Sequence, residues 1–326
     1  MNNFKKIGMT ALAASLVSTS VFAGEVTVSG GASMTVEGYS SAGSINAGKG
    51  FSMGNQLTFT GGGELDNGMT VGISFILDQG DDGTTTGTAH NGTSPFDNHS
   101  ISISSDSMGT FVMHGEGGSN AQAAIDTTAA GDIWDTFDGA NVGTAVSSST
   151  SGADIMVYTL PSMVDGLSVS ASYSPQQAAA ASSTAYALTY TGFDGLSASY
   201  GKGEANTAAS STDADTTTMK ASYAYGSFTV AYSNNDYQSN VADADQETSS
   251  YKLSYTVSDA VSVSYGHEEI EKEGTTTDAE FDKISASYTS GGMTVTATSA
   301  ESKNAIHSTG ALDDRDYWSL GLSFAF

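Results

Sequence analysis

Residues 116–152 gather carboxylates around a small apolar set and contain neither lysine nor arginine. The acids are Glu116, Asp126, Asp132, Asp135 and Asp138. Carboxylates grouped in this way create a negative field that attracts cations, whereas a protease or lipase on a barrel would need a Ser/His/Asp or His/Asp set. The segment therefore favours a site that handles charge over one that breaks bonds.

The same segment carries Ile133, Trp134 and Phe137. A long polar connection gains little from large apolar side chains unless they are buried against another part of the protein. We expect these three residues to pin the segment against an inner wall, where its acids would narrow a passage. The alternative is an external loop with a small core of its own.

The remaining candidates for chemistry are weaker. The five histidines (His90, His99, His114, His267 and His307) lack companion motifs, so a surface enzyme is disfavoured. An adhesin would show internal repeats, and none is seen beyond a regular alternation of strands and turns. With a net charge of −26 the chain would repel nucleic acid.

Paired acids in other connections are weak candidates for calcium ligands, because calcium prefers carboxylate oxygens. They are Asp81 with Asp82, and Asp313 with Asp314. None matches an EF-hand spacing, so solvated acidic loops are the default and no confident metal or other cofactor site is predicted.

The elements that must position these residues are strands. Phe326, Phe324, Leu322, Leu320 and Trp318 alternate with small or polar residues, which is the period of a strand with one apolar face. Similar alternation, bounded by glycine, asparagine and aspartate, marks sixteen strands near residues 26–36, 57–59, 69–77, 101–103, 111–113, 154–160, 167–173, 186–190, 196–200, 219–225, 228–232, 251–257, 261–265, 284–288, 293–297 and 318–326.

The two ends of the chain place these strands in a membrane. Residues 1–23 read as a secretory signal peptide: Lys5 and Lys6 precede a short apolar run, and a small-x-small cleavage site ends at Ala23. Residues 24–326 would then form one β-barrel. We expect the last strand to close this barrel on Val26 and Val28, with its apolar face toward lipid.

The connections support the same architecture. Short turns follow the even-numbered strands, and longer polar loops follow the odd-numbered ones, as in bacterial outer-membrane barrels. A soluble β-sandwich is the alternative, but the second face of each strand is serine, threonine, glycine and alanine, which cannot pack a core. We therefore predict an all-β fold, a transmembrane antiparallel barrel of sixteen strands with an inward-folded third loop. Such a barrel keeps an aqueous channel.

The whole mature chain resembles the general diffusion porins of Gram-negative bacteria, especially the alphaproteobacterial, Rhodobacter-type branch. The residues that carry the resemblance are Glu25–Gly30, Met108–Phe111 and Leu320–Phe326. It implies an outer-membrane location, a homotrimer, and export through the secretion translocon and the barrel-assembly machinery. Trp318, Phe324 and Phe326 are the expected assembly signal.

The resemblance also implies that basic residues on the wall face the acids of the third loop. The inward phase of the strands offers Lys220, Lys252 and Lys283, and His114 points inward just before the loop. With the excess of acids, we predict a cation-selective channel for small hydrophilic solutes and ions. A substrate-specific outer-membrane channel is the closest alternative.

Overall fold

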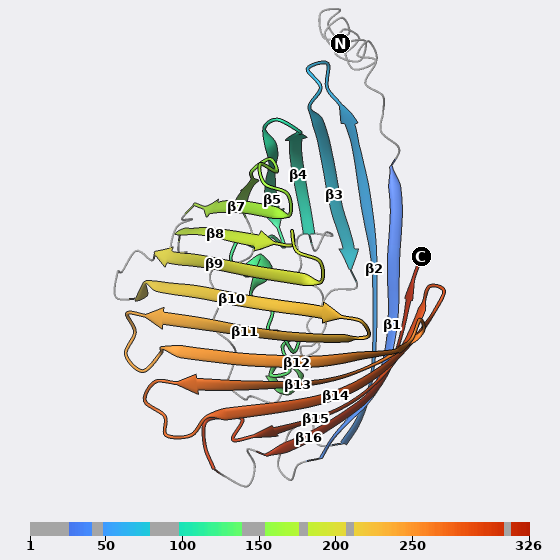
Figure 1. The fold of residues 1–326 in the computed structure, drawn as a ribbon, viewed down its shortest axis with the longest axis vertical. Coiled ribbons are helices and arrows are strands. Elements are labelled where there is room, and N and C mark those ends of the chain that lie inside the picture. Colours follow the sequence, from blue (N-terminus) through green and yellow to red (C-terminus); the bar gives the residue numbers. More distant parts are fainter. Residues whose placement is uncertain are drawn as a thin grey trace, which may run out of the picture.

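The computed structural model describes residues 26–40, 48–78, 98–138, 154–175, 182–206, 212–309 and 314–326. Within these ranges, sixteen strands form one closed barrel in which each strand pairs antiparallel with its neighbours in sequence, and β1 pairs with β16 (Figure 1). The predicted fold is confirmed. The strands are β1 (Thr27–Ser40), β2 (Gly48–Glu64), β3 (Thr70–Asp78), β4 (Asn98–Ser105), β5 (Gly109–Glu116), β6 (Ile155–Thr159), β7 (Leu167–Ser174), β8 (Ser182–Tyr190), β9 (Leu196–Asn206), β10 (Ala214–Tyr225), β11 (Phe228–Ser239), β12 (Gln246–Ser258), β13 (Val261–Lys272), β14 (Ala279–Ser290), β15 (Met293–Lys303) and β16 (Arg315–Ala325).

The barrel closes at Gly30 rather than at Val26 and Val28, so that detail of the prediction is wrong. Phe326 donates its amide to the carbonyl of Gly30 at 3.0 Å, and the amide of Gly30 donates back at 2.8 Å. A Cβ on Gly30 would lie only 2.8 Å from the ring of Phe326. The missing side chain therefore lets the terminal ring cover the first strand.

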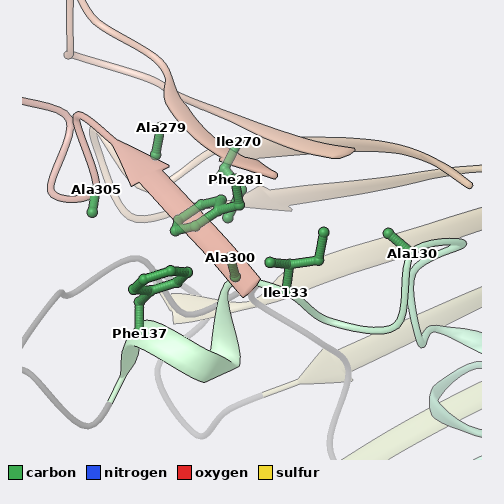
Figure 2. Close-up of a cluster of buried hydrophobic side chains, with 8 residues drawn as sticks. All are labelled: Ala130, Ile133, Phe137, Ile270, Ala279, Phe281, Ala300 and Ala305. Atoms are coloured by element: carbon green, nitrogen blue, oxygen red, sulfur yellow. The ribbon is translucent and has the colours of Figure 1, made fainter. Parts of the chain in front are cut away.

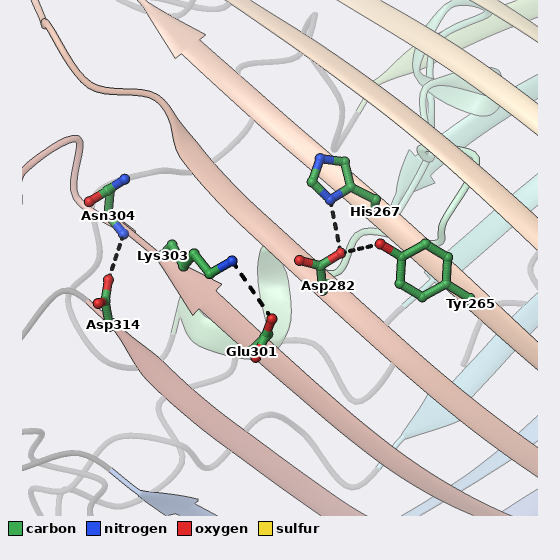
Figure 3. Close-up of polar contacts among 7 residues, drawn as sticks. All are labelled: Tyr265, His267, Asp282, Glu301, Lys303, Asn304 and Asp314. Carbon is green, nitrogen blue, oxygen red and sulfur yellow. Dashed lines mark hydrogen bonds and ion pairs between the residues drawn. The ribbon is translucent and has the colours of Figure 1, made fainter.

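The two faces of the strands differ as the alternation predicts. Large apolar side chains such as Leu253, Ile284 and Leu320 are exposed on the outer face, as a lipid-facing surface requires. Toward the long loops this face becomes polar: Asp282 accepts a hydrogen bond from the hydroxyl of Tyr265 and contacts His267, and Lys303 pairs with Glu301 nearby (Figure 3).

The strand β2 is much longer than the alternation predicts, since it begins at Gly48. Gly50 and Gly54 have no side chains, so they interrupt the alternation of polar and apolar residues by which a strand is recognised in the sequence. Residues 1–25, including the predicted signal peptide, lie outside the described residues. Within the described part of the chain, no helix combines the length and apolar character needed to cross a membrane.

Candidate functional site in the barrel interior

The segment after β5, residues 117–138, lies inside the barrel along its wall. It contains two short helical turns, η1 (Ala123–Ile125) and α2 (Asp135–Asp138), drawn in green behind the front strands in Figure 1. Inward-facing hydroxyl oxygens accept hydrogen bonds from its backbone amides. The amide of Ala121 donates to Ser172 on β7 at 2.9 Å, and the amide of Ala129 donates to Ser233 on β11 at 2.8 Å. The prediction of an inward-folded third loop is confirmed.

Further contacts continue this seam across neighbouring strands. The side-chain amide of Gln122 donates to Thr218 on β10 at 2.7 Å, and the backbone amide of Ala130 donates to Ser250 on β12 at 3.0 Å. Gly266 on β13 makes the close approach possible, because a Cβ there would lie 2.8 Å from the Cβ of Ala130. The small polar inner face thus binds the backbone of the segment directly.

An apolar cluster fixes the far end of the segment. Ile133 and Phe137 are 0% and 1% exposed, and the ring of Phe137 lies 5.8 Å from that of Phe281. Figure 2 shows both side chains directed toward strands β14 and β15, and Trp134 packs at the edge of the same cluster. The expectation that these three residues pin the segment to the wall is confirmed. The buried members are Ala130, Ile133, Phe137, Ile270, Ala279, Phe281, Ala300 and Ala305.

Two of the three predicted lysines contact the segment itself. The Nζ of Lys220 donates to the carbonyl of Thr127 at 2.6 Å, and the Nζ of Lys283 donates to the carbonyl of Gly131 at 3.2 Å. Lys252 lies within electrostatic range of both ammonium groups. Lys220 and Lys283 therefore hold the backbone of the loop.

Two of the predicted acids share this region. Asp126 and Asp132 both lie within electrostatic range of Lys220. Burial and, to a smaller extent, the nearby charge of Asp132 raise the pKa of Asp126 to about 6, against the opposing effects of a backbone hydrogen bond and of Lys220. The surroundings of Asp126 therefore hold the pKa of its carboxyl well above the ordinary value for aspartate.

The other predicted residues lie at the two ends of the segment. Glu116 and His114 are on β5, where the segment begins. The backbone of Gly118 packs closely on His114, since a Cβ at Gly118 would lie 2.5 to 3.2 Å from atoms of that side chain. Asp135 lies near Tyr39 of β1, whose hydroxyl donates to the carbonyl of Thr136 at 3.0 Å. The side chain of Asp138 lies outside the described residues.

Sequence reasoning missed two acids on the inner wall. Glu268 of β13 is fully buried and contacts the segment, and Glu37 of β1 accepts a hydrogen bond from Tyr317 at 2.8 Å. Their inward direction follows from strand phase, because Tyr265 on β13 and Val36 on β1 are exposed on the outer face. The phase could have identified both residues as inward-facing acids.

The calcium candidates stay a prediction. Asp81, Asp82 and Asp313 lie outside the described residues, and Asp314 accepts a hydrogen bond from the amide of Asn304 at 3.1 Å (Figure 3). Over the described ranges, no three or more histidine, aspartate or glutamate side chains are grouped as metal ligands.

Comparisons with known proteins agree with this architecture. Solved structures with the same fold include an anion-selective porin from Comamonas acidovorans (17% identity, TM-score 0.65, covering 93% of this chain and 99% of that one). A porin refined at 1.8 Å resolution matches at 18% identity and TM-score 0.67, over 93% of this chain and 100% of the other.

A multiply substituted mutant of Rh. blastica porin matches at 16% identity and TM-score 0.66, over 93% of this chain and 100% of the other. No match was found among curated protein sequences. The sequence model of the Gram-negative porin family matches residues 8–289. With that match over most of its length, the chain belongs to the Gram-negative porin family.

Proposed function

We propose that this outer-membrane porin is a cation-selective general diffusion channel, in which the segment 117–138 forms the constriction. The family and the fold indicate a passive channel rather than an enzyme. The observation that carries the proposal is the course of the segment: it lies on the inner wall of the barrel and brings Asp126, Asp132 and Asp135 into the interior, while its described residues include no cation of their own.

The overall balance of charge supports the sign of the selectivity. Lys220 and Lys283 each donate to a loop carbonyl, which uses part of their hydrogen-bonding capacity on the protein itself. The whole chain carries 36 acidic against 10 basic residues. Cations should therefore concentrate in the channel and anions should be depleted from it.

The fold alone does not determine this sign, since a porin of the same architecture is described as anion-selective. Selectivity must come from the side chains that line the passage. The reversal potential of the purified protein in planar bilayers, measured across a potassium chloride gradient, tests the proposal. A potential of the sign set by potassium supports it, and one of the sign set by chloride overturns it.

That the channel passes many kinds of small solute, without preferring one, is a separate part of the proposal. Apart from the apolar cluster, the segment docks on serine and threonine hydroxyls of the inner face, which are small polar contacts without evident specificity for one solute. We expect liposome swelling with sugars of increasing size to show a smooth decline with a size limit. Preference for one sugar over others of equal size would instead support a substrate-specific channel.

We propose a homotrimer as the assembled form. The outer tyrosines, such as Tyr173, Tyr200 and Tyr255, lie from β6 onward, and the only tyrosine of β1–β5, Tyr39, faces inward. Tyrosine belts suit a lipid interface, so the face without them, with Met53 and Ile101, is the better candidate for protomer contacts. Chemical cross-linking in mild detergent should give a trimer, and a monomer would contradict the proposal.

A further inference from the structure

Glu268 on β13 is an acid buried in the inner wall directly against the constriction segment, with 0% of its surface exposed. One carboxylate oxygen accepts a hydrogen bond from the hydroxyl of Thr128, and the other accepts one from the backbone amide of Trp134 at 3.0 Å. A carboxylate is costly to bury unless hydrogen bonds replace its water. Both donors come from the segment, so Glu268 and the loop satisfy each other.

Two hydrogen bonds connect Thr128, which Glu268 holds, to Asp132. The backbone amide of Asp132 donates to the Thr128 hydroxyl oxygen at 2.7 Å, and the carboxylate of Asp132 accepts the amide of Thr128 at 2.9 Å. The hydroxyl hydrogen is then directed to Glu268. Residues 128–132 thus form a closed turn whose hydroxyl is fixed by a wall residue, and the carboxylate of Asp132 is part of that turn.

The position of Asp132 matters because its carboxylate interacts electrostatically with several other charged groups of the site. It lies within electrostatic range of Lys220, Lys283 and Asp126. A shift of the turn would change the distance from the Asp132 carboxylate to each of these charges. The apolar cluster around Ile133 and Phe137 holds the segment to the wall, but apolar contact has no preferred direction, whereas the two hydrogen bonds of Glu268 do.

We propose that Glu268 is a positioning residue for ion selectivity: it fixes the turn at Thr128 and thereby the place of the Asp132 carboxylate in the constriction. The inference rests on the proposed channel function. Because Glu268 is covered by the segment it holds, it acts through Asp132 and not as a charge exposed to permeating ions.

The central variants are Glu268→Gln and Thr128→Val. Glutamine keeps the size of the side chain, but its NH₂ group replaces one of the two oxygens that accept hydrogen bonds from the segment. That NH₂ group then faces another donor, and one hydrogen bond is lost. Valine removes the hydroxyl without changing any charge. Loss of a hydrogen bond to a charged group should raise the population of the released turn about 10- to 100-fold. Thr128→Ser restores the hydroxyl and should behave as the unmodified protein.

Glu269→Gln is the matched control. Glu269 is the next residue on the same strand, on the opposite, outer phase, and the substitution makes the same change of charge. Two readouts are measured for each variant. One is the reversal potential in a potassium chloride gradient. The other is acrylamide quenching of Trp134, made the only tryptophan by Trp318→Phe in every protein compared, since the chain has two.

We expect Glu268→Gln and Thr128→Val to reduce cation selectivity and to increase quenching, with no change in Thr128→Ser or Glu269→Gln. If Glu268→Gln alone changes the reversal potential, its own charge is responsible and the inference is overturned. Increased quenching without any change in selectivity also overturns it. If the unmodified channel prefers anions, the proposed function fails, and unchanged quenching in both variants would separately refute the anchor.

Discussion

The ammonium group of Lys220 lies 2.6 Å from the backbone carbonyl of Thr127, so a charged wall residue holds the loop by its main chain. Replacing Lys220 by methionine removes one positive charge from the constriction and keeps most of the side-chain volume. We expect a higher cation-to-anion permeability ratio, because Asp126 and Asp132 lose a nearby positive charge. Reversal potentials in a salt gradient measure the change.

Lys202→Met is the control for this prediction. Lys202 makes the same change of charge but lies on the outer face, where it pairs with Glu204 at 3.5 Å and Asp215 at 3.4 Å. Exposed pairs of this kind contribute about 0–1 kcal/mol to stability, so the barrel should fold normally. Equal shifts in both variants would show that overall charge, and not the constriction, sets the ratio.

The titration of Asp126 predicts a pH dependence. Its pKa in the folded protein is raised from 3.8 to about 6, so the docked segment favours the neutral acid. The stabilising contribution is therefore complete below a pH of about 3.8 and is lost as the pH rises through about 6. Over the same rise the channel gains a negative charge, and cation selectivity should increase.

Asp126→Asn removes this titration. We expect the step in selectivity near pH 6 in the unmodified channel to disappear in the variant, which should be less cation-selective at neutral pH than the parent protein. A step of the same size and midpoint in Asp126→Asn would assign the pH dependence to another group. Reversal potentials recorded at several pH values give both curves.

The sequence predicts the barrel because each strand alternates between a lipid face and a water face, and this alternation is visible residue by residue. It fails at the start of β2, where Gly50 and Gly54 carry no side chain that could mark a face. The alternation also does not predict the register in which β16 pairs with β1, since the pairing of Phe326 with Gly30 depends on how the ring covers the glycine.

Strand phase predicts which side chains face the interior better than it predicts what they contact there. The acids, the apolar trio and the inward lysines can be found from composition and strand phase. That Lys220 and Lys283 bind carbonyls follows only from the path of the loop backbone. Glu268 was overlooked because an isolated inward acid carries no motif, and its donors lie more than a hundred residues away in the sequence.

Phe137 supplies a test of the apolar anchor. Truncating this buried ring to alanine removes its packing against Phe281 and should destabilise the docked segment by about 3–5 kcal/mol. Because the strands are joined by their own backbone hydrogen bonds, we expect the barrel to stay folded. Hydrogen–deuterium exchange should therefore speed up at the amides of Ala121, Ala129 and Ala130, which the wall hydroxyls protect, and stay slow in the strands.

Phe193→Ala is the comparison for this prediction, because Phe193 is 58% exposed in the turn between β8 and β9. It should leave exchange in the segment unchanged. Uniformly faster exchange across the barrel in Phe137→Ala would mean that the segment stabilises the whole fold, and unchanged exchange would mean that the hydrogen bonds alone hold the segment.

The terminal residue gives a prediction about assembly. Phe326 exchanges two backbone hydrogen bonds with Gly30 and covers it with its ring. Deleting Phe326 removes both contributions, whereas Phe326→Ala removes only the ring. If the ring is also the signal for the barrel-assembly machinery, both variants should lose folded protein in the outer membrane, yet the alanine variant should refold in detergent better than the deletion. Heat-dependent migration in gels measures folded protein in both settings. Equal losses in cells and in detergent would assign the defect to closure of the barrel, with no separate role in recognition.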